Sequence, residues 1–268
     1  MQGQTKRSLT RDWLGMTAIA QRILLELWRR KVSLICWAIF PASILIVNSL
    51  ILSERSELST AAAFAQAVPP CLVGTALFFS CLGGSIATIV AEREQRTLKQ
   101  LLISPLRGTS YFMGIFLAYG AIGLGQTLLV YAIAVLTGAK FGVEFTGSLP
   151  LGLLIISLSM VAYVGTGFCI GAKLARRTED VNALIVALGV PLLLLSGAFI
   201  PIEFFPTALR DLAQFNPIYH MIQALAIAQD SDRDNLAPHL WFLVGFTSVM
   251  VCVGWLTYRQ MLYSERRR

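Results

Sequence analysis

Charged residues are scarce in this sequence, and hydrophobic residues are correspondingly abundant. Charged residues make up 14% of the chain, whereas soluble domains carry roughly 25%. Hydrophobic residues make up 56%, and the mean hydropathy is +0.67. This composition excludes a water-soluble globular protein and indicates an integral membrane protein.

Ionisable side chains are also missing from the interior of every long apolar stretch. Proteins that couple transport to protons or sodium usually keep such a group at membrane depth. The sequence from Gly165 to Lys173 is superficially like a phosphate-binding loop, but it lacks the Gly-Lys-Ser/Thr ending and lies in an apolar helix. We therefore expect neither an ion-coupling site nor an ATP site, and no enzymatic activity of the chain itself.

Histidine is rare, and the cysteines do not have the spacing of metal ligands. The two histidines are His220 and His239, and all five cysteines lie within apolar stretches without a C-x-x-C pair. We expect no metal, no cofactor and no catalytic residue, and we interpret the cysteines as small core residues.

Six continuously apolar stretches are long enough to cross a bilayer, which takes about 20 residues per helix. Spanning β-strands would alternate apolar and polar residues, so we expect an all-α membrane protein. The predicted spans are Val32–Leu52, Pro69–Ala91, Tyr111–Leu136, Leu149–Ala172, Val181–Ile200 and Leu240–Tyr258. The predicted organisation is a cytoplasmic N-terminus (1–31), a six-helix transmembrane domain (32–258) and a basic cytoplasmic tail (259–268).

Lysine and arginine are distributed unequally between the two sides of these spans. All but four of the 22 lie on the side of the two termini, the exceptions being Arg55, Lys140, Arg210 and Arg233. Because positive residues favour the inside, we expect both termini in the cytoplasm and the chain in the inner (plasma) membrane. The net charge of +7 is then explained by topology and lipid contact, without nucleic acid.

Two segments outside the spans have helical patterns. Residues Arg11–Lys31 place Trp13, Ile23 and Trp28 on one face, which is typical of an interfacial helix; a cytosolic helix packed on a partner is the alternative. The two external connections that follow the first and third spans are expected to be short. In the longer segment Pro201–His239, we expect a helix over Pro206–Gln214. Asn216 is then predicted to cap a re-entrant helix, Ile218–Gln229, with Pro217 at its first position.

One charged amphipathic segment follows the second span. It reads Glu92-Arg93-Glu94-Gln95-Arg96-Thr97-Leu98-Lys99-Gln100-Leu101-Leu102-Ile103-Ser104-Pro105-Leu106. It closely resembles the E-R-E-x-x-T-L-x-x-L-L-x-(S/T)-P-L segment of the type-2 ABC exporter permeases. Leu195–Pro201, which contains Gly197, and Phe215–His220 are similar to the S-G-x-x-x-P and N-P pair of that family. The resemblance covers about residues 11 to 260.

The resemblance implies a subunit with six spans, an interfacial N-terminal helix, a cytoplasmic coupling helix and external re-entrant helices. It also implies a second permease copy, as a homodimer or related heterodimer, and two separate ATP-binding cassette subunits. The coupling segment is expected to comprise Glu92, Glu94, Arg96, Thr97, Leu98, Lys99, Leu101, Leu102 and Pro105, and the external segment to use Gly197, Pro201, Asn216 and Pro217. Leu98, Leu101 and Leu102 would anchor a helix on the ATPase, its charges would match the groove, and Pro105 would end it. An ordinary amphipathic loop helix on lipid is the alternative.

Uncharged spans favour an apolar or amphipathic substrate, such as a lipid, a lipid-linked glycan or a drug-like molecule. Two other functions remain open. One is an ion-coupled carrier, and the other is a membrane scaffold or assembly protein for envelope or cofactor biogenesis.

Overall fold

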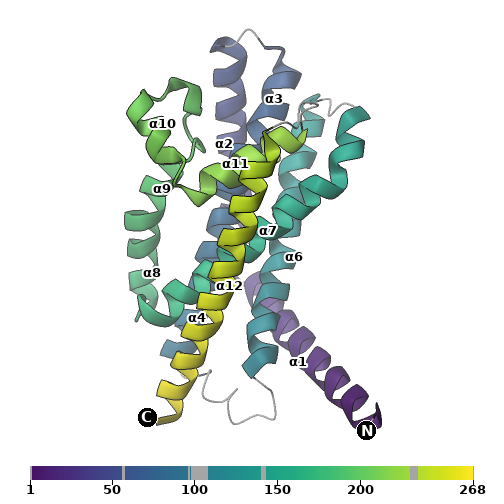
Figure 1. The fold of residues 1–268 in the computed structure, drawn as a ribbon, viewed down its shortest axis with the longest axis vertical. Helices are drawn as coiled ribbons and strands as arrows, with labels where there is room; N and C mark the ends of the chain where they lie inside the picture. Colours follow the sequence, from purple (N-terminus) through teal and green to yellow (C-terminus); the bar gives the residue numbers. More distant parts are fainter. Residues whose placement is uncertain are drawn as a thin grey trace.

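The protein is a bundle of long helices with no strand among the residues that the structure describes. The structure, a computed structural model, describes residues 2–55, 58–95, 97, 108–139, 143–229 and 235–267; the side chains of 2–11, 143–148, 203 and 265–267 are not part of that description. Both termini lie at one end of the bundle (Figure 1), which we call the terminal end, and the opposite end is the distal end.

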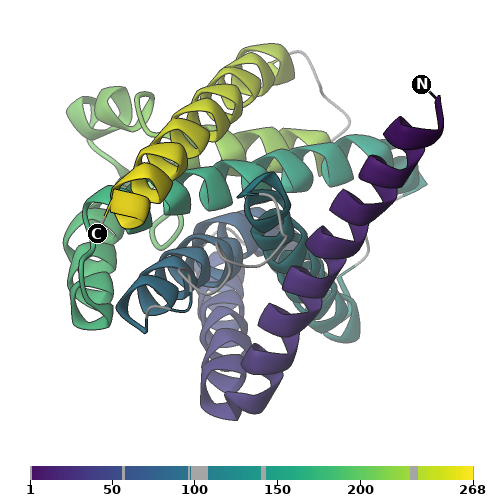
Figure 2. The same cartoon turned by 90° about the horizontal axis from the view of Figure 1, so that it is seen from below.

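The N-terminal half begins with a helix that leaves the bundle obliquely (Figures 1 and 2). Ile19 and Ile23 of this helix are buried, while Trp13 and Trp28 on its outer side are exposed. The chain then rises to the distal end and returns. The elements are α1 (Gln2–Arg29), α2 (Lys31–Arg55), α3 (Thr60–Pro69), η1 (Pro70–Gly83) and α4 (Gly84–Glu94).

The C-terminal half crosses the bundle four further times and forms a helical layer at the distal end (Figure 1). The crossings comprise α6 (Gly108–Leu136), α7 (Val143–Lys173), the run α8 (Thr178–Leu184), η2 (Ile185–Gly189) and α9 (Val190–Leu195), and finally α12 (Leu236–Arg267). The distal layer comprises η3 (Ile202–Phe204), α10 (Thr207–Ala213) and α11 (Pro217–Gln229).

The expected all-α membrane architecture is confirmed. Six helical runs of the described chain are long and apolar enough to span a membrane. The interior of the second run is the most enclosed, with 83% of its most apolar window buried, against 17% for the first and fifth runs. The run of α3, η1 and α4 therefore lies at the centre, and α2, α6, α7 and α8 pack against it.

The predicted loop before the second span was partly wrong, because residues 60–69 form α3. The stretch is rich in alanine, which favours helix, and it buries Ala63, Phe64 and Ala67. The hydroxyl oxygen of Ser59 accepts a hydrogen bond from the backbone N–H of Ala62 at 3.3 Å and caps the start. Pro69 and Pro70 follow, and since proline lacks a backbone N–H, the chain rewinds there into the π-helical turns of η1.

Two span ends also differ from the prediction. The fifth span ends at Leu195 rather than Ile200, because the backbone reverses at Gly197, whose φ is +84°. The last helix continues to Arg267, beyond the predicted end of the sixth span at Tyr258.

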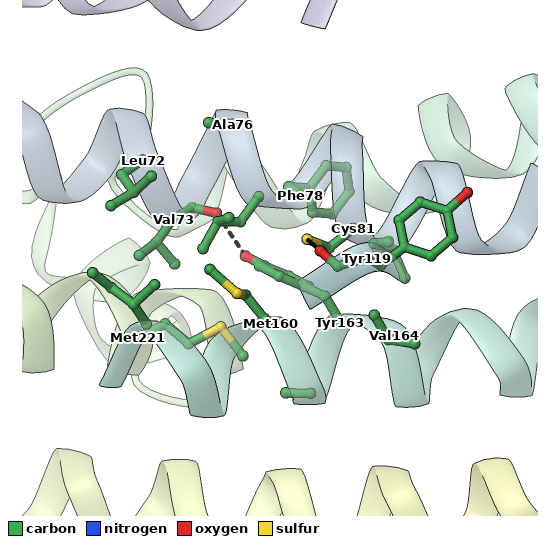
Figure 3. Packing of buried hydrophobic residues seen from close by; sticks show 14 of the residues in the cluster. Leu72, Val73, Ala76, Phe78, Cys81, Tyr119, Met160, Tyr163, Val164 and Met221 are labelled. Carbon is green, nitrogen blue, oxygen red and sulfur yellow. Dashed lines mark hydrogen bonds between the residues drawn. The ribbon is translucent and has the colours of Figure 1, made fainter. Parts of the chain in front are cut away.

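Hydroxyl groups inside the bundle are satisfied locally or across helices. Tyr163 on α7 donates a hydrogen bond of 2.9 Å to the carbonyl oxygen of Val73 in η1 (Figure 3). Its ring packs edge-on against Phe78, with 5.9 Å between ring centroids. The same α7 packs closely on α12, since a Cβ added at Gly254 would lie 2.8 Å from the carbonyl oxygen of Gly165. Helix α7 therefore has α12 as one neighbour, and it also packs against α4.

Candidate functional site

The first three charged residues of the amphipathic segment lie at the terminal end of α4 and are bonded to other helices. Glu92 is buried, with 6% of its surface exposed. One carboxylate oxygen forms an ion pair with the Arg22 guanidinium from α1, and the other accepts a hydrogen bond from the Tyr111 hydroxyl of α6. Glu92 therefore joins three helices through one buried charge.

Arg93 binds the terminal end of α7. One guanidinium nitrogen donates to the carbonyl oxygens of Gly171, Ala172 and Ala175, at 2.8, 3.3 and 3.1 Å. The last carbonyls of a helix have no partner within the helix and carry partial negative charge. Arg93 thus satisfies the end of α7 and fixes α4 to it.

Glu94 binds the beginning of α8 in the complementary way. Its carboxylate accepts hydrogen bonds from the Thr178 hydroxyl and from the Thr178 backbone N–H, the latter at 3.0 Å. Asp180 accepts from the backbone N–H groups of Arg176 and Arg177 at 3.1 and 2.9 Å. Negative charge at a helix start is stabilising, so the turn between α7 and α8 is held from both sides.

We call Glu92, Arg93 and Glu94 with these contacts the Glu92–Glu94 junction. It connects the start of the loop to α1, α6, α7 and α8. Thr97 extends it by donating to the Glu92 carbonyl at 3.1 Å. Arg96, Leu98, Lys99, Leu101, Leu102 and Pro105 lie outside the described residues, so the coupling helix and its apolar anchor stay predictions.

Sequence reasoning assigned Glu92 and Glu94 to a partner surface and missed their contacts within the chain. Arg22, Tyr111 and Thr178 are far from them in the sequence. Periodicity within one segment carries no information about such partners. One available signal was Glu92 itself, since a carboxylate next to an apolar span needs a partner if it is buried.

The external residues predicted from the second motif meet at the distal end. Asn216 accepts from the backbone N–H of Ile218 at 3.0 Å and so caps α11, with Pro217 at the first position as predicted. Its amide also donates to the Leu192 carbonyl of α9 at 2.6 Å. Gly197 supplies the reversal after α9, and Pro201 precedes η3. One asparagine therefore ties the start of α11 to α9, directly before the first half of the motif.

The end of α9 has a second attachment, to α2. The Asn48 amide donates to the Ala198 carbonyl at 3.2 Å, and the backbone N–H of Ala198 donates to the Ser196 hydroxyl oxygen at 3.3 Å. These contacts satisfy backbone groups exposed by the reversal at Gly197. The predicted helix over Pro206–Gln214 is confirmed as α10.

The two histidines lie against each other between α11 and α12. Their Nδ1 atoms are 2.9 Å apart, and His220 Nε2 is 2.7 Å from the Gln214 carbonyl oxygen. A carbonyl only accepts, so His220 carries its hydrogen on Nε2 and its neutral Nδ1 accepts from His239. The pair can bind one additional proton but not two, because a second would place a hydrogen on both of the Nδ1 atoms that face each other.

We expect Arg22→Ala to destabilise the protein by about 1–3 kcal/mol, because it leaves the Glu92 charge buried without its cation. This loss is at the lower end of the range for broken buried ion pairs, because 40% of the Arg22 side chain is exposed to solvent. Adding Glu92→Gln should restore part of the loss. Thermal unfolding of the wild type, the two single variants and the double variant in detergent measures this coupling. Strictly additive changes in the free energy of unfolding would contradict the ion pair.

We expect Asn216→Ala to cost about 1–2 kcal/mol through loss of the α11 cap and of the bond to α9. Asn216→Asp is the matched control, because it keeps the acceptor for Ile218 and removes the donor to Leu192. Its midpoint of thermal unfolding should lie between those of the wild type and the alanine variant. Equal midpoints for the aspartate and alanine variants would show that capping contributes nothing.

Acidification should weaken the distal layer. Burial lowers the pKa of His220 below its ordinary value, so the unfolded chain binds more protons than the folded one. This contribution to stability is present above about pH 6.5 and is lost as the pH falls below it. Unfolding midpoints between pH 7.5 and 5 should fall, and His220→Gln should flatten that dependence. An identical pH dependence in the variant would argue against the histidine pair as its cause.

Comparison with known proteins supports the resemblance noted in the motifs. The family model "ABC-2 type transporter" matches residues 15–229. Probable multidrug ABC transporter permease YbhR of Escherichia coli (strain K12) is 29% identical over 175 residues, which cover 65% of this chain and 46% of YbhR. Inner membrane transport permease YhhJ of the same organism is 29% identical over 141 residues, covering 51% of this chain and 36% of YhhJ.

A relative of similar length is the putative transport permease ycf38 of Cyanophora paradoxa. It is 26% identical over 265 residues, which cover 92% of this chain and 88% of ycf38. The chain spans less than half the length of YbhR and YhhJ. The family match covers well over half of the chain and agrees with its six apolar helices, and this multi-pass membrane protein belongs to the ABC-2 type transporter family.

Proposed function

We propose that the chain is the transmembrane permease subunit of an ATP-driven ABC exporter. Both termini would face the cytoplasm from the inner membrane, as the distribution of lysine and arginine favours. The chain would act with a second permease copy and two separate ATP-binding cassette subunits, which would hydrolyse the ATP. Membership of the family and the names of the relatives support this proposal.

The observation that carries the proposal is the Glu92–Glu94 junction. A permease subunit driven by a separate ATPase needs a contact point from which the displacement of one loop is transmitted to several spans. The junction binds the start of that loop to α1, α6, α7 and α8 through a buried carboxylate, a guanidinium and a helix-capping carboxylate. In this proposal, residues 95–105 contact the ATPase, and displacement of the loop moves these helices together.

The cargo would be apolar or amphipathic: a lipid, a lipid-linked glycan or a drug-like molecule. Support comes from a cavity of about 280 Å³ between α6, α7 and α11, lined by side chains such as Leu128, Leu153, Ile156 and Leu225. At its wall the Gln229 amide donates to the Tyr131 hydroxyl at 2.7 Å. YbhR is named a probable multidrug permease, which fits the drug-like class.

The test is recovery of the ATPase with the tagged chain. Membranes are cross-linked before mild detergent extraction, and ATPase activity is assayed on the purified complex. We expect stoichiometric ATP-binding subunits and at least a tenfold loss of recovered activity in Leu98→Asp and Leu101→Asp, because a charge in an apolar contact is unpaired. Gln100→Asp is the matched control, since Gln100 lies on the opposite face of the predicted helix.

A cross-linked homodimer without an ATPase would contradict the proposal and favour the carrier or the scaffold. A requirement for a proton gradient would then identify the carrier. If the leucine variants and the Gln100→Asp control recover equal ATPase activity, the coupling helix does not lie in this segment.

A further inference from the structure

A polar cavity lies at the terminal end, between α1, α2, α4 and α6. Its volume is about 130 Å³. Two ion pairs stand at its wall, one between Arg22 and Glu92 and one between Arg30 and Glu26, where an Arg30 guanidinium nitrogen is 2.6 Å from a Glu26 carboxylate oxygen. Among the residues that the structure describes, two cations and two anions therefore face one small space, and their charges balance.

The arginines of this wall have hydrogen-bonding capacity that the described chain does not use. Arg22 Nε is inaccessible and has no hydrogen-bond partner among the described residues. The side chains of Arg30 and Glu26 are 54% and 52% exposed, so both can turn toward a ligand. Thr88 and Tyr119, which also line the cavity, already share a hydrogen bond of 2.6 Å.

A second, apolar groove of about 520 Å³ lies next to this cavity, along the seam between α2 and η1. Trp37 lines both spaces. On the α2 side, Arg30 and Ser33 line the polar cavity. Ile39 and Phe40, which lie further into the span, line the groove. On the facing side the order is the same, from Ala91 and Thr88 in the cavity to Phe79 and Ala76 in the groove.

Close packing fixes the side chain at the point where the two spaces meet. A Cβ added at Gly84 would lie 2.9 Å from the Trp37 ring, so the glycine leaves room for the indole between α2 and α4. Phe40 and Phe79 then pack edge to face, with ring centroids 5.2 Å apart, along the groove. The seam is therefore polar and charged at the membrane edge and aromatic and apolar toward the membrane interior.

We propose that this seam binds one phospholipid with a zwitterionic phosphoethanolamine headgroup. The phosphate would bind Arg22 and Arg30, the ammonium group would bind Glu26, and one acyl chain would lie along Trp37, Phe40 and Phe79. Balanced charge favours a zwitterion over an anionic headgroup, since each arginine already faces a carboxylate. The ammonium group donates hydrogen bonds to a carboxylate, whereas a quaternary choline has none to donate. This site is independent of the proposed transport activity.

The experiment is fluorescence quenching of the full-length chain in vesicles that contain brominated phosphatidylethanolamine, phosphatidylcholine or phosphatidylglycerol. Bromine on the acyl chain quenches a nearby indole, and comparison of the three lipids gives relative association constants. We expect about three- to fivefold stronger association of phosphatidylethanolamine, the size of one exposed charge-assisted contact. Trp37→Phe should remove the headgroup-dependent part of the signal.

Single substitutions separate the two halves of the headgroup. Glu26→Gln should abolish the preference for ethanolamine over choline, and Arg30→Gln should weaken association of both. Glu54→Gln, at the exposed distal end of α2, is the matched control and should change neither. Both Glu26 and Arg30 are surface residues, so these variants should fold.

Three results would overturn the proposal. They are equal quenching by all three lipids, preference for phosphatidylglycerol, and headgroup-dependent quenching that persists in Trp37→Phe. The Glu54→Gln control should retain the ethanolamine preference. If Glu26→Gln retains it too, the role assigned to Glu26 is overturned.

Discussion

A buried carboxylate cannot remain charged without partners, and Glu92 is the point where this constraint organises the terminal end. Its charge is compensated by Arg22 and its second oxygen by the Tyr111 hydroxyl. Tyr111 in turn stacks on Tyr258 of α12, with 5.5 Å between ring centroids, and Tyr258 donates to the Gly108 carbonyl at 3.1 Å. The position of α1, the start of α6 and the last span thus all depend on one glutamate.

The same constraint explains the polar contacts at several helix ends. In an apolar surrounding, backbone groups left free by a helix end must find partners within the protein. Arg93 serves the end of α7, Glu94 the start of α8, and Asn216 both the end of α9 and the start of α11. Inside the spans, hydroxyls such as Ser49 and Ser159 donate back to carbonyls four residues earlier, whereas Tyr163 donates across the bundle to the Val73 carbonyl.

The sequence predicted what depends on local composition and missed what depends on contact. Continuous apolar runs located all six spans, and the Asn-Pro pair predicted the start of α11, because capping is a local effect. The end of α9 was placed five residues too late, since Ile200 is apolar but the chain had already turned at Gly197. Glu92 lies 70 positions after its partner Arg22, and no pattern within one segment reveals that pair. The histidine pair was missed for the same reason: His220 and His239 belong to different helices.

Close packing determines how a displacement at the junction would spread. Gly167 of α7 lies directly against Ser85 of α4, and Gly165 lies against Gly254 of α12. Helices in contact at backbone distance cannot slide without collision, because interiors are packed like solids. Arg93 adds a charged connection between α4 and α7, and Glu94 connects both to α8. The fifth span is otherwise loosely enclosed, with only 17% of its apolar window buried. A force on the loop would therefore move α4, α7 and α12 as one body, while Glu94 carries the motion to the start of α8, in a span that few neighbours enclose.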